Sequence, residues 1–232
     1  MIIVKIADIV FKINCRGKYL EHLCKDYITN DENIQCEITI ADQDIEYEAS
    51  ISKEVFPKGY LEAIAAYRLI EKELYKYDAF LFHSSVVEVD GMAYGFAAKS
   101  GTGKTTHSKL WLEYLPNKAR IINGDKPIIR LTNNIPYIYG TPWNGKEGYG
   151  INTKAPLKAI CFIERAKDNS IRELNDNEIN SHLFLQLLIP SDESIIEKYF
   201  DNINRMMNYT KFYLLKCNMN VEDAKIAYEK MK

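Results

Sequence analysis

A short loop of glycines and hydroxyl residues constrains this chain more than any other feature, since residues 100–106 read Ser-Gly-Thr-Gly-Lys-Thr-Thr. The two glycines let the backbone turn tightly and aim successive N–H groups at one anion. Lys104 would supply a positive charge for β- and γ-phosphates, and Thr105 a hydroxyl for Mg²⁺. A helix over residues 105–115 would direct the positive end of its dipole at the same phosphates.

The loop departs from the usual phosphate-loop pattern at one position, because Ala98 stands five residues before Gly103, where a glycine is usual. The remaining spacing is intact, and the pair of Lys104 and Thr105 favours phosphate binding over a plain turn that caps a helix. We therefore expect a nucleotide to be bound by Ser100, Gly101, Thr102, Gly103, Lys104, Thr105 and Thr106.

The residues before the loop indicate which class of nucleotide site this is. Two apolar, β-rich runs, 80–89 and 92–98, are separated by Asp90-Gly91, which predicts a hairpin. The loop would then follow the second strand of an antiparallel hairpin. In common P-loop NTPases the strand before the loop belongs to a parallel, helix-covered sheet. The pattern therefore disfavours GTPases, motor ATPases and enzymes like adenylate kinase.

A carboxylate follows the next predicted strand. The apolar run 119–122 ends at Asn-Gly-Asp-Lys, residues 123–126, and Asp125 is well placed to meet Mg²⁺ or the γ-phosphate. The alternative is a simple turn, because Asn-Gly-Asp is turn chemistry and Asp125 could bond its own backbone. Behind a phosphate loop we favour the functional role.

Residues 140–150 contain four glycines and a proline around Trp143, Lys146 and Glu147. Glycines free the backbone to move or to approach a ligand, and loops on a rigid sheet often hold substrate contacts. We expect a substrate-facing loop or lid with Lys146 as its charged group. The alternative is an ordinary mobile surface loop with Trp143 packed underneath.

Composition excludes several classes of function. The 232 residues carry a net charge of −2, and the pI is about 6.1, so no basic field recruits nucleic acid or anionic lipid. No apolar run approaches the roughly 18 residues of a membrane span, and residues 1–5 lack a signal-peptide pattern. Five scattered cysteines favour reduced thiols in a cytoplasmic protein over a metal site. Homo-oligomer formation is left open.

The domain organisation is predicted from the order of the elements. Residues 1–76 are expected to form a small α+β subdomain that ends with an amphipathic helix over 60–75. Residues 77–232 would form the nucleotide-binding core, with 157–163 as a central strand that ends near Arg165. Its C-terminal part is expected to be mainly helical, over 176–188, 194–207 and 221–230.

The segment from His83 to Lys126 resembles the catalytic core of HPr kinase/phosphorylase and of ATP-dependent phosphoenolpyruvate carboxykinase. Those families share a hairpin-fed Ser-Gly-x-Gly-Lys-[Ser/Thr] loop and an acidic motif after the next strand. The chain is closer still to small HPr-kinase-like proteins of anaerobic bacteria. That likeness rests on residues 100–106, 110–111, 123–127, 140–147 and 156–159.

The resemblance implies an α/β (mixed α+β) fold with a phosphoenolpyruvate carboxykinase/HPr kinase-like P-loop core and a mixed, largely antiparallel sheet. His83 falls where HPr kinases carry a histidine on the strand before the loop, which implies proton transfer or phosphate positioning; a structural histidine is the alternative. Asp125 falls on the second of two adjacent aspartates, and Gly124 replaces the first. Lys126 would keep Asp125 ionised or neutralise the charge of a phosphate. The alternative is an ordinary exposed lysine.

Two functions follow as hypotheses. The first is a kinase that uses ATP and Mg²⁺, the metal being held by Thr105 and Asp125, with Asp125, His83, Lys146 and Lys126 as catalytic residues. Its acceptor would be a hydroxyl group, either a serine of a protein or peptide or part of a small metabolite. The second is a non-catalytic module that senses ATP, which the missing first aspartate favours.

Overall fold

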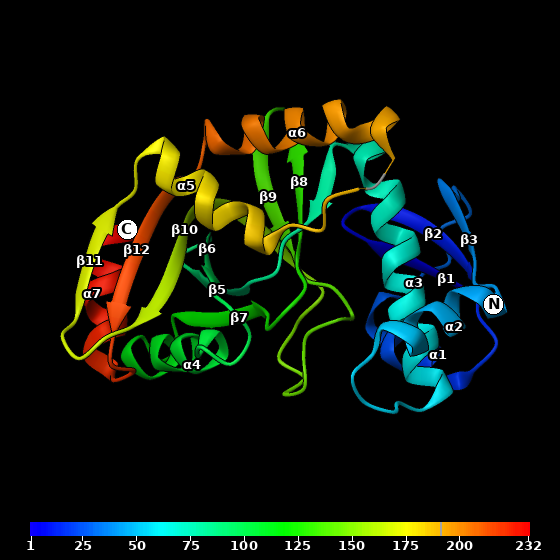
Figure 1. Ribbon diagram of the computed structural model, residues 1–232, viewed down its shortest axis with the longest axis horizontal. Coiled ribbons are helices and arrows are strands. Elements are labelled where there is room, and N and C mark those ends of the chain that lie inside the picture. Colours follow the sequence, from blue (N-terminus) through cyan, green and yellow to red (C-terminus); the bar gives the residue numbers. More distant parts are fainter. Residues whose placement is uncertain (191) are drawn as a thin grey trace. The chain divides into compact units, whose positions relative to one another are not determined.

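The computed structural model describes residues 1–190 and 192–232, and it divides the chain into two compact units, Met1–Tyr77 and Asp78–Lys232 (Figure 1). Each unit has a sheet and helices of its own.

The first unit contains a three-stranded sheet in the order β1-β2-β3. Strands β1 and β2 form an antiparallel hairpin, whose turn residues Ala7 and Asp8 have positive φ, and β3 runs parallel to β2. The elements of this unit are β1 Ile2–Ile6, β2 Ile9–Asn14, α1 Lys18–Leu23, β3 Cys36–Thr39, α2 Asp42–Ile51 and α3 Lys58–Leu74, with 3₁₀ turns at Lys25–Tyr27 and Tyr75–Tyr77.

Helix α3 buries the apolar stripe that its sequence predicts, including Leu61, Ile70 and Leu74. Helix α2 was not predicted from the sequence. It is attached to α3 by an ion pair between the buried Glu48 and Arg68.

The second unit is built on a nine-stranded mixed sheet with the main order β4-β8-β9-β10-β6-β5-β7, to which β12 and β11 are added beside β10. Its strands are β4 Ala79–Leu81, β5 Ser85–Val89, β6 Met92–Ala97, β7 Ala119–Asn123, β8 Ile128–Thr132, β9 Ile135–Tyr139, β10 Lys154–Arg165, β11 Ser170–Glu173 and β12 Lys211–Cys217. Its helices are α4 Lys104–Tyr114, α5 Asp176–Leu183, α6 Glu193–Met207 and α7 Val221–Met231, with a 3₁₀ turn at Phe184–Gln186.

Helices cover both faces of this sheet, with α5 and α6 on one side and α4 on the other in Figure 1. The first face buries Phe162 of β10 against α5 and α6, where Leu183 and Tyr199 are buried. The second face buries Cys161, the neighbour of Phe162 in β10, among residues of α4 and α7 such as Trp111 and Ala227. Because successive side chains of a strand point to opposite faces, β10 is covered on both sides, as its apolar sequence predicts.

The predicted hairpin before the loop is confirmed. Strands β5 and β6 are antiparallel, and Asp90 and Gly91 form the turn between them with φ of 51° and 80°. Positive φ at both turn residues suits the right-handed twist of the two strands. The sheet as a whole is mixed, because β10 runs parallel to both β6 and β12.

The strand predicted over residues 80–89 was wrong as a continuous element. It is interrupted between β4 and β5, and His83 lies in the gap rather than on a strand. The backbone N–H of His83 donates to the Gln186 carbonyl at 3.0 Å, and that of Ser84 donates to the Asp125 carbonyl at 3.2 Å. Both backbone donors thus leave the strand ladder for partners outside it.

The helix predicted over residues 176–188 was too long. It ends at Leu183 and continues as the short 3₁₀ turn, after which Leu187 forms an antiparallel bridge with Phe82. The chain must therefore extend here to reach the sheet.

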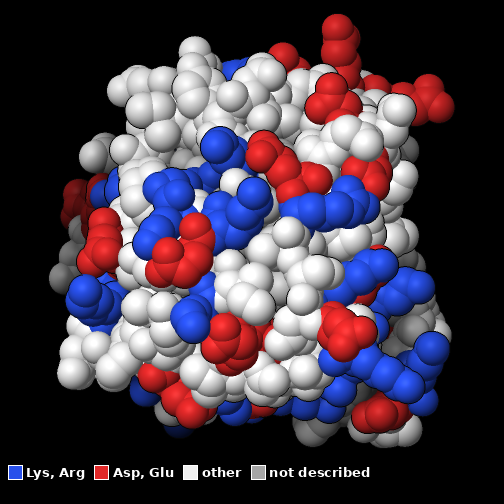
Figure 2. Space-filling view, turned by 90° about the vertical axis from the view of Figure 1, so that its left-hand side faces the viewer, with Lys and Arg blue, Asp and Glu red and all other residues white. Residues whose placement is uncertain are grey.

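The surface near β11 and α7 mixes both signs of charge, as Figure 2 shows for the side that lies at the left in Figure 1. Ion pairs such as Arg172–Glu178 and Lys225–Glu222 accompany this mixing. Within the described residues, no helix combines the length and the apolar character needed to cross a membrane.

Candidate functional site

The loop of residues 98–103 connects β6 directly to the first turn of α4. Gly101 and Gly103 have φ of 79° and 123°, values that side chains rarely adopt, so glycine is required at both positions. Among the described residues, Ala98 is not one of those with positive φ, so an alanine there is unstrained. The missing first glycine therefore leaves the geometry of the loop intact.

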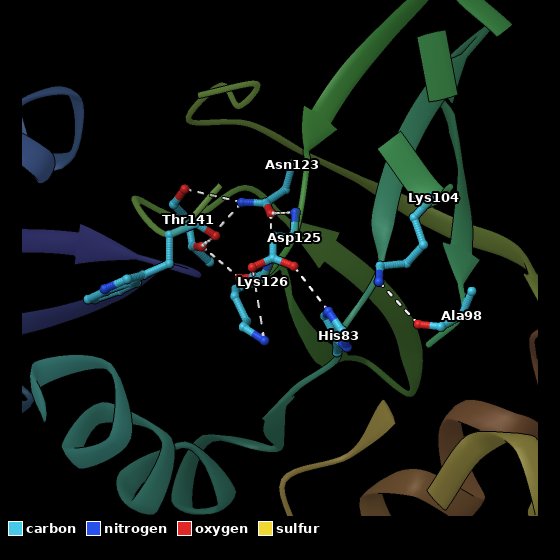
Figure 3. A network of polar contacts seen from close by, with 8 residues as sticks. His83, Ala98, Lys104, Asn123, Asp125, Lys126 and Thr141 are labelled. Atoms are coloured by element: carbon cyan, nitrogen blue, oxygen red, sulfur yellow. Dashed lines mark hydrogen bonds and ion pairs between the residues drawn. The ribbon is translucent and has the colours of Figure 1, made fainter. Parts of the chain in front are cut away.

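Lys104 is the first residue of α4, and its side chain turns back across the loop. Its Nζ donates to the Ala98 carbonyl at 3.1 Å, and the residue is only 8% exposed (Figure 3). Burial lowers the pKa of Lys104, whereas the negative charge of Asp125 acts to raise it. Lys104 is thus a largely desolvated cation at the floor of the loop.

One residue at the end of β10 and one that follows β12 contact the loop from outside. Arg165, at the end of β10, donates from Nε to the Thr102 carbonyl at 2.8 Å. Met219 lies against Gly103, where a Cβ atom would approach its Cε to 2.5 Å. Because Cε is the end of a flexible side chain that can shift, the requirement for glycine at residue 103 comes mainly from its φ.

The turn after β7 is shaped by Asn123 and not by Asp125. Asn123 is fully buried, and its Oδ1 accepts from the backbone N–H of Asp125 at 2.9 Å and of Lys126 at 2.8 Å. Its Nδ2 donates to the carbonyl of Thr141 at 3.1 Å. Because the side chain of Asn123 makes the hydrogen bonds that stabilise the turn, the carboxylate of Asp125 is left for another partner.

That partner is His83, whose Nε2 lies 3.1 Å from Oδ1 of Asp125 (Figure 3). Burial raises the pKa of Asp125, but the hydrogen bond from His83 and the positive charges of Lys126 and Lys104 outweigh it. The net effect is a pKa below the usual value, so Asp125 is ionised at neutral pH. The Nζ of Lys126 is 4.0 Å from the other oxygen of Asp125.

Gly124 is packed closely against the backbone of the 140–150 loop. A Cβ atom at this position would lie 2.6 Å from the carbonyl oxygen of Asn144 and 3.2 Å from that of Tyr149. Both contacts are with backbone, which cannot move aside as a flexible side chain would. A carboxylate at residue 124 is thus incompatible with the position of the 140–150 loop.

The 140–150 loop has a buried start and an exposed tip. Thr141 is fully buried, Trp143 is half-buried, and residues 145–149 are exposed. At the tip, Glu147 pairs with Lys109 of α4 at 2.5 Å between Oε2 and Nζ. Lys146 is exposed beside this pair, and its proposed role in a lid stays a prediction.

These segments surround an open cleft of about 460 Å³. The predicted site residues on its wall are His83, Ser100, Gly101, Gly103, Lys104, Thr105, Thr106, Asp125 and Lys146. Thr102 and Lys126 are not among the lining residues. Thr102 accepts a hydrogen bond from Arg165, which lines the cleft, and Lys126 adjoins Asp125, which does so too. The other lining residues are Gly124, Asn144, Gly145, Glu147 and Arg165.

Sequence reasoning missed Asn123 and Thr141, the buried pair that shapes the acidic turn. Asn123 precedes a Gly-Asp pair, and an asparagine at the start of a turn commonly bonds the backbone two residues on. The sequence therefore contained a signal for the role of Asn123 in the turn. Nothing in the sequence pointed to Thr141 as its partner.

The donors of the cleft suit Mg²⁺ only together with a nucleotide. Within residues 1–190 and 192–232, no three or more His, Cys, Asp or Glu residues gather to hold a metal by themselves. The hydroxyl of Thr105 and the carboxylate of Asp125 face the same cleft. Mg²⁺ commonly takes one or two protein oxygens and completes its shell with phosphates and water.

No family model and no curated protein matches the sequence. Among solved structures, the chain is similar to the Hpr(Ser) kinase/phosphatase from Coxiella burnetii, with a TM-score of 0.39 and 8% sequence identity. The superposition covers 65% of this chain and 95% of that one. Values this low do not establish a common fold, so a functional conclusion has to come from the cleft itself.

The close approach at Gly124 predicts a cost for any side chain there. Gly124→Ala should lower the free energy of unfolding by about 1–3 kcal/mol, because the methyl group would overlap the carbonyl of Asn144. Urea denaturation followed by circular dichroism measures the change. Gly95→Ala is the matched control, since a Cβ atom there meets Ile160 at an ordinary 3.5 Å. Equal stability of the Gly124→Ala variant and the wild type would show that the loop does not press on Gly124.

Proposed function

We propose that this protein is an ATP-dependent kinase that transfers the γ-phosphate of ATP to a hydroxyl acceptor. The observation that carries the proposal is the placement of Asp125. Its ionised carboxylate is free of the turn and faces the same cleft as Lys104 and Thr105 of the phosphate loop. Phosphoryl transfer needs positioning and charge stabilisation more than covalent chemistry, and this arrangement is suited to both.

In this proposal the triphosphate is bound by residues 100–106. The backbone N–H groups of the loop and the N-terminus of α4 bind phosphate oxygens, and Lys104 adds a full charge. Arg165 holds the loop through Thr102 and lines the same cleft, which places a second cation beside the phosphates. The strand–loop–helix order supports a P-loop core of the phosphoenolpyruvate carboxykinase/HPr kinase type within residues 77–232, beside a subdomain of residues 1–76.

Thr105 and Asp125 would hold Mg²⁺ between them together with phosphate oxygens. When bound, the metal ion would neutralise part of the negative charge of the triphosphate. Asp125 and His83 form the acceptor side of the cleft, where the hydroxyl of a protein or peptide serine, or of a small metabolite, would approach. Lys146 and Lys126 would balance the charge that develops during transfer.

A second candidate, a module that binds ATP and regulates a partner without phosphoryl transfer, is favoured by Gly124. The resembling enzymes have two adjacent acidic residues, and this cleft has space for one. Incubation with γ-labelled ATP separates the two candidates. Labelled phosphate found on a defined acceptor supports the kinase, and binding without turnover supports the sensor.

The first prediction of the proposal concerns Lys104. Lys104→Met removes the charge but keeps most of the apolar stem, so it should weaken MgATP binding at least about a hundredfold, a typical loss for a buried charged contact. Isothermal titration calorimetry measures the affinity. Because burial disfavours the charged form of Lys104, thermal stability should not fall. Lys99→Ala, an exposed lysine in the same loop, is the control; unchanged affinity in Lys104→Met would contradict the loop assignment.

The second prediction concerns Asp125. Asp125→Asn keeps the shape but removes the charge, so ATP turnover should fall by about a hundredfold or more while nucleotide binding is retained. The rate of labelled phosphate release gives the result. The lowered pKa of Asp125 also predicts a stabilising contribution that is present at neutral pH and lost as the pH falls through its folded-state pKa. A folded variant with wild-type turnover would reduce Asp125 to a structural residue.

The third prediction concerns the tip of the 140–150 loop. If Lys146 completes the charge around the γ-phosphate, Lys146→Ala should leave ADP affinity within about threefold and lower ATP turnover by about tenfold or more. Comparing the change in kcat with the change in ADP affinity separates an effect on phosphoryl transfer from an effect on nucleotide binding. Lys230→Ala, an exposed lysine on α7, controls for the loss of a surface charge. Full turnover in Lys146→Ala would refute the role of the loop tip and leave the phosphate loop untouched.

A further inference from the structure

Asn123 lies at the end of β7, fully buried, and both ends of its side-chain amide are occupied. Its Oδ1 accepts from the backbone N–H groups of Asp125 and Lys126. Its Nδ2 donates to the carbonyl and to the hydroxyl of Thr141, at 3.1 and 3.2 Å. A single side chain thus connects the acidic turn to the beginning of the 140–150 loop (Figure 3).

Thr141 closes this connection from the other side. Its Oγ1 donates to the carbonyl of Lys126 at 2.7 Å, so the loop bonds the turn directly as well as through Asn123. Thr141 is also fully buried. Buried hydrogen bonds of this kind are costly to break, because the separated groups would be left without partners.

The far end of the loop is fastened to the same strand. Gly150 forms an antiparallel bridge with Asn123, and the N–H of Ile151 donates to the carbonyl of Ile122 at 3.0 Å. A Cβ atom at Gly140 would lie 2.0 Å from the carbonyl oxygen of Ile151, so the two ends of the loop touch through their backbones. The glycines at the loop ends therefore serve close packing.

We propose that Asn123 is the positioning residue of the phosphoryl transfer: it joins Asp125 and the 140–150 loop into one unit, so that the acceptor side of the cleft is formed before nucleotide binds. This inference rests on the proposed kinase function. Asn123 touches neither phosphate nor acceptor in this role. It acts through Asp125, whose carboxylate it leaves free for His83, and through Thr141, which fixes the start of the loop.

Asn123→Asp separates the two connections. The retained Oδ1 still accepts from the turn, but the second oxygen is an acceptor that faces the carbonyl of Thr141, so the bond to that carbonyl is lost. In the full-length protein we expect the amide of Ile151 to exchange with solvent at least about tenfold faster, because its segment opens more often. The amides of β12 should be unchanged.

The kinetic result should be a split between turnover and binding. A small displacement of catalytic groups is enough to lower kcat for MgATP, with labelled phosphate release as the readout, by about tenfold to a hundredfold. Affinity for MgADP, measured by calorimetry, should stay within about threefold, because the phosphate loop is not bonded to Asn123. A residue needed only for folding would lower both in proportion to the fraction unfolded.

Thr141 supplies a conservative pair if Asn123→Asp fails to fold. Thr141→Ser keeps the hydroxyl, so both the exchange protection of the Ile151 amide and kcat should stay within about twofold of the wild type. Thr141→Val has nearly the same shape but no hydroxyl, and it should repeat the faster exchange and lower kcat.

The outcomes distinguish this inference from the function on which it rests. Unchanged exchange at Ile151 or unchanged kcat, in a folded Asn123→Asp variant of a protein that turns over ATP, would overturn the positioning role alone. Equal behaviour of Thr141→Ser and Thr141→Val would overturn the part of the connection that the Thr141 hydroxyl makes. A wild type that neither binds MgADP nor hydrolyses MgATP would overturn the kinase proposal, and the positioning role with it.

Discussion

The parallel pairing of β10 with β6 and β12 is the constraint on which the second unit depends. Residues 159–162 of β10 pair with both strands, and residues 163–165 pair with β12, while the first three residues of β10 pair antiparallel with β9. Parallel neighbours end at the same edge of a sheet. The glycine loop after β6, Arg165 at the end of β10 and Met219 after β12 therefore meet, as the contacts of Arg165 with Thr102 and of Met219 with Gly103 show. The acidic turn reaches this edge because β7, like β6, pairs antiparallel with β5.

Local signals in the sequence were sufficient for the elements around the loop. The Asp90-Gly91 turn fixed the hairpin, and the glycine spacing before Lys104 indicated where α4 begins. The strand order could not be predicted, because pairing among β6, β10 and β12 joins segments far apart in the chain. Helix α2 was missed because it is largely charged and buries few side chains, among them Ile45 and Glu48, so it lacks a clear apolar stripe.

The break at His83 shows a second kind of failure. The run from Phe80 to Val89 is nearly continuous in apolar residues, which favours one strand. The backbone N–H groups of His83 and Ser84 donate to the carbonyls of Gln186 and Asp125, and these tertiary hydrogen bonds override that tendency. The same contacts bring His83 to Asp125. The break between β4 and β5, which the sequence did not predict, therefore also places His83 on this side of the cleft. Asp125 itself was found from its spacing, whereas its release from the turn depends on Asn123 and became visible only in three dimensions.

The burial of Lys104 has a consequence for how the cleft meets an anion. Most of the water around this ammonium group is already gone, and the carbonyl of Ala98 stands in for it. An arriving phosphate would meet a cation that has little solvent left to lose, which makes the attraction stronger than at an exposed lysine. Because burial lowers the pKa of Lys104 and a phosphate would raise it, protonation of this lysine and occupancy of the loop favour each other. In alkaline solution, filling the loop would therefore draw a proton from the solvent, and the empty loop would release it.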